Sequence, residues 1–347
     1  MGLPISDFLL TAETQRSRED LIFSLFSAIQ RLCGKKSEID NLKSKINHMQ
    51  RRTFFINTAF TTAGILLTQK SLLASIFQTP AFKITMLNEN MGIFTEQGGT
   101  ILFLLSNDGI VVVDSQFPAP ATHLIEELKK KSDKPFVKLI NTHHHGDHTG
   151  GNISFKGIAE HVVAHENSKT NQQKVAIAQK KEDQNLYPDQ TYTIDWSEKI
   201  GKEKVSLHYF GPGHTNGDSF VHFEHANIVH MGDLLFNRRH PFVDRTAGAN
   251  IASWITVLNK AEKKFSKKTT FVYGHSQTGF EVTGKIDDLK QFGDYLGNLL
   301  KFTDAEIKAG KTKEEILKTT TLPFKTEWSG DGLARPLGAA YDELTMK

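Results

Sequence analysis

A group of histidines directly follows a short apolar run, and this arrangement limits the folds open to the chain. Residues 140–152 read INTHHHGDHTGGN, and the preceding FVKLI, residues 136–140, has the length and composition of a buried strand. The histidines therefore lie on a loop at the C-terminal end of a strand. Proteins that combine strands with helices place their binding and catalytic residues at such positions. The feature favours an α/β fold.

The six residues HHHGDH, 143–148, carry side chains that suit a metal ion. Zinc in proteins is bound by neutral imidazoles and carboxylates, three or four to each ion. On an extended segment His143 and His145 point to the same side, and the histidine between them points away. A sharp turn at Gly146 would then aim Asp147 and His148 at a second point nearby. The loop thus predicts two half-sites for metal.

Each half-site needs further ligands from elsewhere in the chain. Three later glycine-rich segments each offer one suitable residue after an apolar run: His214 in GPGHTNGD, Asp233 in HMGDLLF and His275 in YGHSQTG. The chain has a single cysteine, Cys33, which excludes a disulfide framework, an iron–sulfur cluster and a multi-thiolate zinc site. The remaining ligands must therefore be histidines and carboxylates.

From residue 82 onward, short apolar runs alternate with amphipathic stretches. TILFLL and IVVVD flank the turn SNDG, so residues 100–114 are predicted to form a hairpin. Further strands are predicted at 136–140, 161–165, 204–210, 219–223, 227–231 and 270–275, and helices at 123–133, 168–182, 251–265 and 286–301. Both halves contain a β-rich run followed by helix and strand. This pattern predicts two packed sheets with helices outside, a four-layer αββα sandwich.

Residues 302–347 are predicted to form a C-terminal helical tail. The segment is polar and rich in Lys and Glu, and it contains the helix-favouring stretches KEEILKTT, residues 313–320, and YDELTMK, residues 341–347. We expect short helical turns at both places.

The charge balance indicates the class of partner. Lys and Arg total 42 and Asp and Glu total 39, and the excess of positive charge lies in the first 79 residues. The remainder is close to neutral, so it lacks the basic surface that nucleic-acid binding requires. We expect a small-molecule substrate.

Residues 49–81 resemble a twin-arginine export signal. Arg51 and Arg52 precede Phe54 and a Thr-rich and Ala-rich apolar run that ends before Gln69. The run is shorter and more polar than a typical membrane-spanning helix. The resemblance implies an exported, periplasmic protein that meets the export machinery. Two alternatives stay open: a membrane anchor through residues 53–77, and a buried helix with a basic edge.

Residues 1–48 form an N-terminal extension in front of this segment. Met49 stands two residues before the arginine pair, so we expect that it is the true start and that the extension is an over-long gene prediction. The alternative is a real helix, because Leu21, Leu25, Ile29 and Leu32 have helical spacing.

Five segments in chain order resemble the motifs of the metallo-β-lactamase-fold hydrolase superfamily. They are IVVVD, HHHGDH, GPGHTNGD, HMGDLLF and YGHSQTG. The superfamily's pattern is His-x-His-x-Asp-His, then His, then Asp or Cys, then His, and the match spans roughly residues 84–300. The resemblance implies a catalytic domain at 82–301 and two zinc ions. It assigns the first ion to His143, His145 and His214, the second to Asp147, His148 and His275, and the bridging position to Asp233. Asp114, which ends IVVVD, would support the histidine loop without binding metal; the alternative is a plain turn residue.

The implied chemistry is hydrolysis. Two ions that share a water lower its pKa towards 7, and the resulting hydroxide would attack a carbonyl ester, amide or lactam, with Asp147 orienting it as the catalytic carboxylate. A serine nucleophile is not supported, since GPGHTNGD has no G-x-S-x-G elbow. In the segment NRRHPFVDRTAG, His240 and Asp244 are predicted to contact substrate; the alternative is a rigid structural loop.

Other functions remain open at this point. Asp233 stands where lactamases with a zinc-bound thiolate have Cys, which favours glyoxalase II-like, lactonase-like or broad hydrolases, although export suits a β-lactamase proper. An iron-dependent sulfur dioxygenase-like oxidoreductase has similar ligands, so iron or manganese could replace zinc. A non-enzymatic metal-binding protein is the third alternative.

Overall fold

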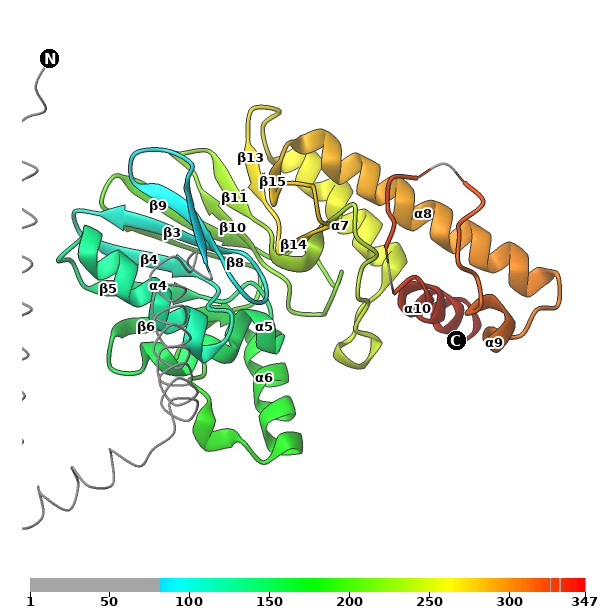
Figure 1. Cartoon of the computed structure of the whole chain (residues 1–347), viewed down its shortest axis with the longest axis horizontal. Coiled ribbons are helices and arrows are strands. Elements are labelled where there is room, and N and C mark those ends of the chain that lie inside the picture. Colours follow the sequence, from blue (N-terminus) through cyan, green and yellow to red (C-terminus); the bar gives the residue numbers. More distant parts are fainter. Residues whose placement is uncertain (1–81, 325, 331, 347) are drawn as a thin grey trace, which may run out of the picture. The chain divides into compact units, whose positions relative to one another are not determined.

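The computed structural model describes residues 82–324, 326–330 and 332–346. The described residues belong to one compact unit, shown in colour in Figure 1. The predicted N-terminal extension and export segment, residues 1–81, lie outside the described residues. Within the described residues, no helix has both the length and the apolar character needed to cross a bilayer.

The first sheet has seven strands in chain order. β1 to β4 pair antiparallel, and β4 to β7 pair parallel. The strands are β1 (Lys83–Met86), β2 (Met91–Thr95), β3 (Ile101–Ser106), β4 (Gly109–Val113), β5 (Phe136–Ile140), β6 (Ala159–His165) and β7 (Gln190–Tyr192). The predicted hairpin at 100–114 is β3 and β4, and FVKLI is β5.

The second sheet has six strands in the order β15-β13-β11-β10-β9-β8. They are β8 (Asp195–Ile200), β9 (Glu203–His208), β10 (Phe220–Phe223), β11 (Ile228–His230), β13 (Thr270–Val272) and β15 (Thr283–Gly284). A separate short pair joins β12 (Phe236–Asn237) to β14 (His275–Ser276) in parallel.

The helices lie on the outer faces of the sheets. They are α4 (Pro118–Lys131), α5 (Gly146–Thr149), α6 (Glu166–Gln179), α7 (Ile251–Lys264), α8 (Ile286–Lys308), α9 (Lys313–Ile316) and α10 (Ala334–Thr345). Short 3-10 turns are η1 (Gly150–Phe155), η2 (Glu182–Gln184), η3 (Gly232–Leu234) and η4 (Arg245–Ala247). Proline at the first position of α4 fits there because the first helical N–H has no partner within the helix.

Strand alternation produces the layers. In β3, Leu102 and Leu104 belong to the core between the two sheets, whereas Ile101 and Phe103 belong to the core under α4. A third core, on the far side of the second sheet, contains Trp254 of α7 together with residues of α8. The order is helix, sheet, sheet, helix, as Figure 1 shows, and the predicted four-layer αββα sandwich is confirmed.

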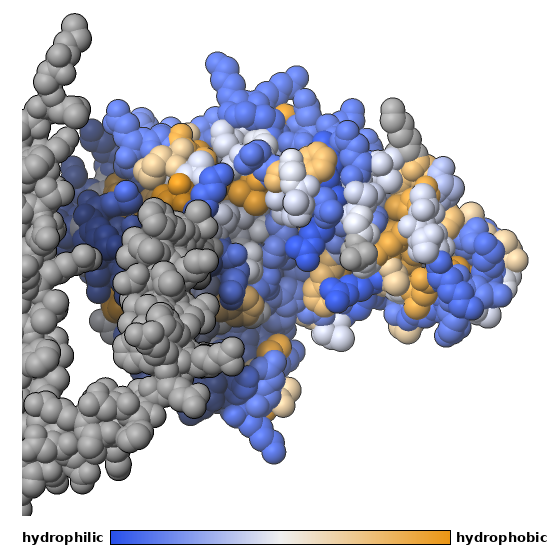
Figure 2. Space-filling model, viewed as in Figure 1, coloured by the Kyte–Doolittle hydropathy of each residue, from blue (hydrophilic) through white to orange (hydrophobic). Residues whose placement is uncertain are grey.

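The predicted boundary between residues 301 and 302 does not separate two parts of the structure. α8 continues through it to Lys308, and the following segment buries Ile316, Trp328 and Leu337 in the third core. The tail is therefore part of the packed unit, because these apolar residues lie among its polar ones. Figure 2 shows apolar surface beside α8 and α10 in the same part of the molecule.

Candidate metal centre

Seven side chains from four separate segments meet where strands of both sheets end. β5 leads into the loop of His143, β9 into that of His214, β11 into Asp233 and β13 into His275. The sheet pairings β4–β5 and β11–β13 are parallel, so their carboxyl ends lie at one edge. The sequence motifs converge for this reason.

The first group contains His143, His145, His214 and Asp233. Nδ1 of His145 lies 3.1 Å from Nε2 of His143 and 2.9 Å from Nε2 of His214. Oδ2 of Asp233 lies 4.0 Å from Nε2 of His143 and 3.6 Å from Nε2 of His214. Ligand atoms around one tetrahedral zinc, at about 2.0 to 2.1 Å from it, are separated by similar distances.

The second group contains Asp147, His148 and His275. Nε2 of His148 and Nε2 of His275 are 3.4 Å apart, and Oδ2 of Asp147 is 3.0 Å from the latter. Asp233 also borders this group, with Oδ1 at 3.1 Å from His148 Nε2 and Oδ2 at 3.5 Å from His275 Nε2. One carboxylate therefore lies between both groups, in the position assigned to the bridging ligand.

The hydrogen bonds on the outer side of the rings fix where their protons lie. His148 Nδ1 faces Oδ2 of Asp114 at 2.8 Å, and His214 Nδ1 faces the carbonyl oxygen of Phe242 at 2.8 Å. Since both partners only accept, these nitrogens carry the N–H. Each Nε2 then points into the cluster, where it can offer a lone pair to a metal ion.

The same reasoning applies to the other two rings of the histidine loop. His145 Nε2 faces Oδ2 of Asp244 at 2.9 Å. Thr142 Oγ1 donates to Asp114, so it accepts from His143 Nδ1 at 3.0 Å. Four imidazole nitrogens thus face one another inside the cluster, an arrangement that a cation stabilises and that outer carboxylates commonly support in zinc proteins.

Asp233 gives independent support for a bound cation. Its side chain is buried, and within the described residues Oδ1 forms no well-aligned hydrogen bond, although Nε2 of His148 lies 3.1 Å away. A buried carboxylate oxygen without a partner is costly unless an ion binds it. The donor set of imidazole and carboxylate groups fits zinc.

Burial and charge shift the pKa values of the three fully buried histidines in opposite directions. Burial lowers the pKa of His143 well below its ordinary value and that of His214 to about 3. Burial would also lower the pKa of His148, but the carboxylates of Asp233 and Asp114 outweigh it and raise that pKa well above the ordinary value. Without metal, His143 and His214 are neutral at neutral pH, whereas His148 holds a proton.

The cluster opens on one side. The side chains of Asp147, His145 and His275 are 31%, 17% and 14% exposed, whereas those of His143, His148 and His214 are at most 1% exposed. A substrate would therefore approach from the side of Asp147.

Asp114 lies where the sequence places it, behind the histidine loop. Its Oδ1 accepts the backbone N–H of Thr142, and its Oδ2 accepts from Thr142 Oγ1 and His148 Nδ1. It is fully buried and has φ of 65°, in the left-handed region. It orients one ligand and holds the loop that carries the others.

The two residues predicted to contact substrate have other partners. Nδ1 of His240 faces the hydroxyl of Tyr295 in α8 at 2.8 Å, and His240 is 9% exposed. Asp244 caps η4 and accepts from His145, so its oxygens serve a metal ligand and the loop. Tertiary packing turns His240 towards the third core and Asp244 towards the histidine loop, and their contact with substrate stays a prediction.

Two further expectations about the loop are also corrected or extended. Gly146 has no left-handed φ, and a Cβ there would meet nothing within 4 Å, so the turn does not require glycine. His144 points away from the first group, as predicted, with Nε2 at 3.6 Å from Asp244 Oδ2. His230, at the end of β11, is buried, and its Nε2 donates to the carbonyl of Thr100.

The sequence reasoning missed two glycines on which the cluster depends. A Cβ at Gly99 would lie 2.1 Å from Cε1 of His148, and one at Gly274 would lie 2.0 Å from Oδ1 of Asp233. Only glycine leaves room for these two ligands. The sequence features that could have indicated these close contacts are the adjacent glycines of TEQGGT and the glycine before His275.

Comparison with known proteins agrees with this geometry. A sequence of 24% identity over 207 residues, covering 57% of this chain and 80% of the other, is the metallo-beta-lactamase type 2 of Elizabethkingia meningoseptica. A hydroxyacylglutathione hydrolase of Crocosphaera subtropica is 30% identical over 142 residues, which cover 38% of this chain and 47% of that enzyme.

The fold has solved counterparts as well. A metallo-beta-lactamase from Pontibacter korlensis superposes with a TM-score of 0.54 at 21% identity, covering 62% of this chain and 99% of the other. The family model of the metallo-beta-lactamase superfamily matches residues 95–275, just over half of the chain, and this range contains all seven cluster residues. The chain is therefore a hydrolase that belongs to the metallo-beta-lactamase superfamily.

Proposed function

We propose that the chain is a two-zinc hydrolase that cleaves a carbonyl ester, amide or lactam. The observation that carries the proposal is the pair of ligand groups that share Asp233, with ring nitrogens that point inward. When bound, two divalent ions supply a nucleophilic water at neutral pH and polarise the carbonyl under attack.

Asp147 is the catalytic carboxylate in this proposal. Burial would raise its pKa, but His148 and the hydrogen bond from His275 lower that pKa to about 2, so the group is ionised at neutral pH. It is the most exposed of the seven side chains, on the open side of the cluster. A charged acceptor there would take a hydrogen bond from the attacking water and orient it.

Exposed aromatic side chains beside the opening suggest the character of the substrate. The ring of Phe242 is 42% exposed and lies 5.4 Å from that of His145. Phe117 is 39% exposed, and a Cβ at Gly98 would approach both its ring and Asp147. Exposed aromatic residues at a site gain free energy by burial against apolar groups. We therefore propose a substrate with an apolar group near the reacting carbonyl.

A test combines metal analysis with a hydrolysis screen. The purified protein is analysed for metal content and then assayed against β-lactams, lactones and thioesters. We expect two zinc ions per chain and hydrolysis of at least one class. Complete inactivity of the two-zinc protein on all three would contradict the proposal. A single iron in place of zinc would favour the oxygenase alternative.

We further propose that the protein is exported to the periplasm through its arginine pair. The support is the sequence of residues 49–81 alone. Cell fractionation of the full chain, compared with a variant carrying Arg51→Lys and Arg52→Lys, tests it. We expect the wild type in the periplasm and the variant in the cytoplasm. Equal distribution of the two would contradict the role of the arginines.

A further inference from the structure

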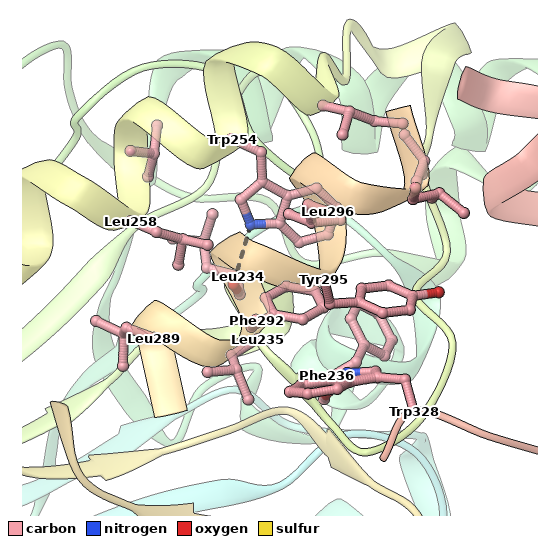
Figure 3. Close-up of a cluster of buried hydrophobic side chains, with 14 of the residues drawn as sticks. Leu234, Leu235, Phe236, Trp254, Leu258, Leu289, Phe292, Tyr295, Leu296 and Trp328 are labelled. Carbon is pink, nitrogen blue, oxygen red and sulfur yellow. Dashed lines mark hydrogen bonds between the residues drawn. The ribbon is translucent and has the colours of Figure 1, made fainter. Parts of the chain in front are cut away.

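The C-terminal segment, here residues 309–346 as far as described, lies beyond the part of the chain that the family model matches. It nevertheless packs on the third core through Ile316, Leu322, Trp328 and Leu337. Trp328 is its largest buried side chain, 6% exposed, and it lies among the aromatic residues of α8. Figure 3 shows it beside Phe236.

The indole ring of Trp328 has contacts on several sides. Its ring stacks on Tyr295 at 5.2 Å and on Phe292 at 5.7 Å between centroids. The guanidinium carbon of Arg238 lies 4.7 Å from the ring centroid. Its indole Nε1 donates to the carbonyl oxygen of Phe236 at 2.8 Å. The indole is therefore fixed in place and in turn fixes the backbone at residue 236.

Phe236 connects this position to the metal centre. Its ring stacks on the imidazole of His275, with centroids 5.6 Å apart and planes at 17°, and meets His214 edge-on at 5.6 Å. Its backbone is also the register partner of His275 in the parallel pair of β12 and β14. Both the side chain and the strand of Phe236 thus determine where His275 lies.

The residue after Trp328 also contacts the backbone that follows Phe236. Ser329 donates its N–H to the carbonyl of Arg238 at 3.2 Å and forms a parallel bridge with Arg239. On the other side of β12, Gln277 donates its N–H to Asn237 at 2.8 Å. The C-terminal segment, β12 and β14 therefore lie side by side, and His275 is on the last of the three.

We propose that Trp328 is a positioning residue for the metal centre and sets the affinity of the second zinc through Phe236 and His275. The inference rests on the proposed two-zinc function. His275 belongs to the second group only. Phe236 contacts it through both its ring and its strand pairing but meets His214 of the first group through a ring edge alone, so the second ion should be more sensitive to Trp328 than the first. Residues that orient a ligand without touching the metal commonly change metal affinity about 10 to 100-fold.

The test measures stepwise zinc binding to the full chain by competition with a chromophoric chelator. We expect Trp328→Ala to weaken the second step about 10 to 100-fold and the first step less. Trp328→Phe, which keeps an aromatic ring and loses the N–H donor, should show a smaller loss. It also replaces the alanine variant if that variant does not fold.

Leu337→Ala is the control, because it removes buried apolar volume from the same segment and leaves the bond to Phe236 intact. It should lower the melting temperature without changing the second zinc step. Unchanged zinc affinity in the tryptophan variants, or an equal loss in Leu337→Ala, would overturn the inference. A wild type that fails to bind two zinc ions would instead contradict the proposed function.

Discussion

Oδ2 of Asp244 lies 2.9 Å from Nε2 of His145, although the two residues are 99 positions apart in the sequence. The contact mirrors the one between Asp114 and His148 on the other side of the cluster. Burial would raise the pKa of Asp244, but the hydrogen bonds from His145 and Thr246 lower it well below its ordinary value. Each ligand group thus has one histidine oriented by an aspartate from another part of the chain.

Asp244→Asn should weaken zinc binding at the first site. The amide can present N–H to His145 Nε2, which disfavours the tautomer with a lone pair on Nδ1. We expect a loss of about 10 to 100-fold in affinity for the first ion, measured by chelator competition. Thr246→Ala, which removes only a bond to Oδ1 of Asp244, serves as the control. Equal affinities in wild type and Asp244→Asn would refute this orienting role.

Gly99→Ala should displace a ligand of the second site. The new Cβ would lie 2.1 Å from the ring of His148, so the ring must move. We expect loss of the second zinc, seen in the metal content, and a stability cost of about 1 to 3 kcal/mol from overpacking. Gly146→Ala in the histidine loop meets no atom within 4 Å and should keep both ions. Two tightly bound ions in the Gly99 variant would show that the close approach is unimportant.

Zinc uptake at the second site should release a proton and weaken as pH falls. In the metal-free protein the pKa of His148 is raised well above its ordinary value, so at neutral pH the ion must displace a proton. Affinity should fall about tenfold for each pH unit below that pKa. The pKa values of His143 and His214 are lowered, so these two first-site ligands are already neutral.

Calorimetry in buffers of different ionisation enthalpy counts the protons released with each ion. His275→Ala, which lacks a second-site ligand, should lose the proton-releasing step and keep the other. If wild type releases no proton with either ion, the protonated state of His148 is wrong.

Removal of metal should destabilise the fold. Ligand binding to the folded state alone adds about 2.7 kcal/mol at a hundredfold excess over Kd, which is about 5 to 10 °C in Tm for a domain of this size. We expect a chelator to lower Tm by at least this amount and zinc to restore it. Asp233→Asn, which alters the residue common to both groups, should show a Tm that hardly responds to zinc. A wild-type Tm that is the same with and without chelator would argue against bound metal.

The sequence predicted the large elements because their side chains repeat with a clear period. Leu124, Ile125 and Leu128 marked α4, and the apolar run FVKLI marked β5. The seven cluster residues were found because each follows such a run and stands near glycine. Parallel strand order then brings the ends together without any further signal in the local sequence.

Other features depended on packing that local patterns do not encode. Trp328 is an isolated apolar residue in a polar stretch, so its burial under α8 could not be predicted from periodicity. The last helix was predicted to begin at residue 341, but α10 begins at Ala334. Pro336 does not prevent this earlier start, because it falls within the first turn, where proline is tolerated. The contact between Asp244 and His145 depends on how a long loop folds back on the cluster.

The most direct test of the two-ion centre is anomalous diffraction at the zinc edge from crystals of the zinc-loaded protein. We predict two peaks about 3.5 to 4 Å apart. One should lie among His143 Nε2, His145 Nδ1 and His214 Nε2, and the other among Asp147, His148 and His275, with Asp233 between them. A single peak, or peaks away from these seven side chains, would contradict the account.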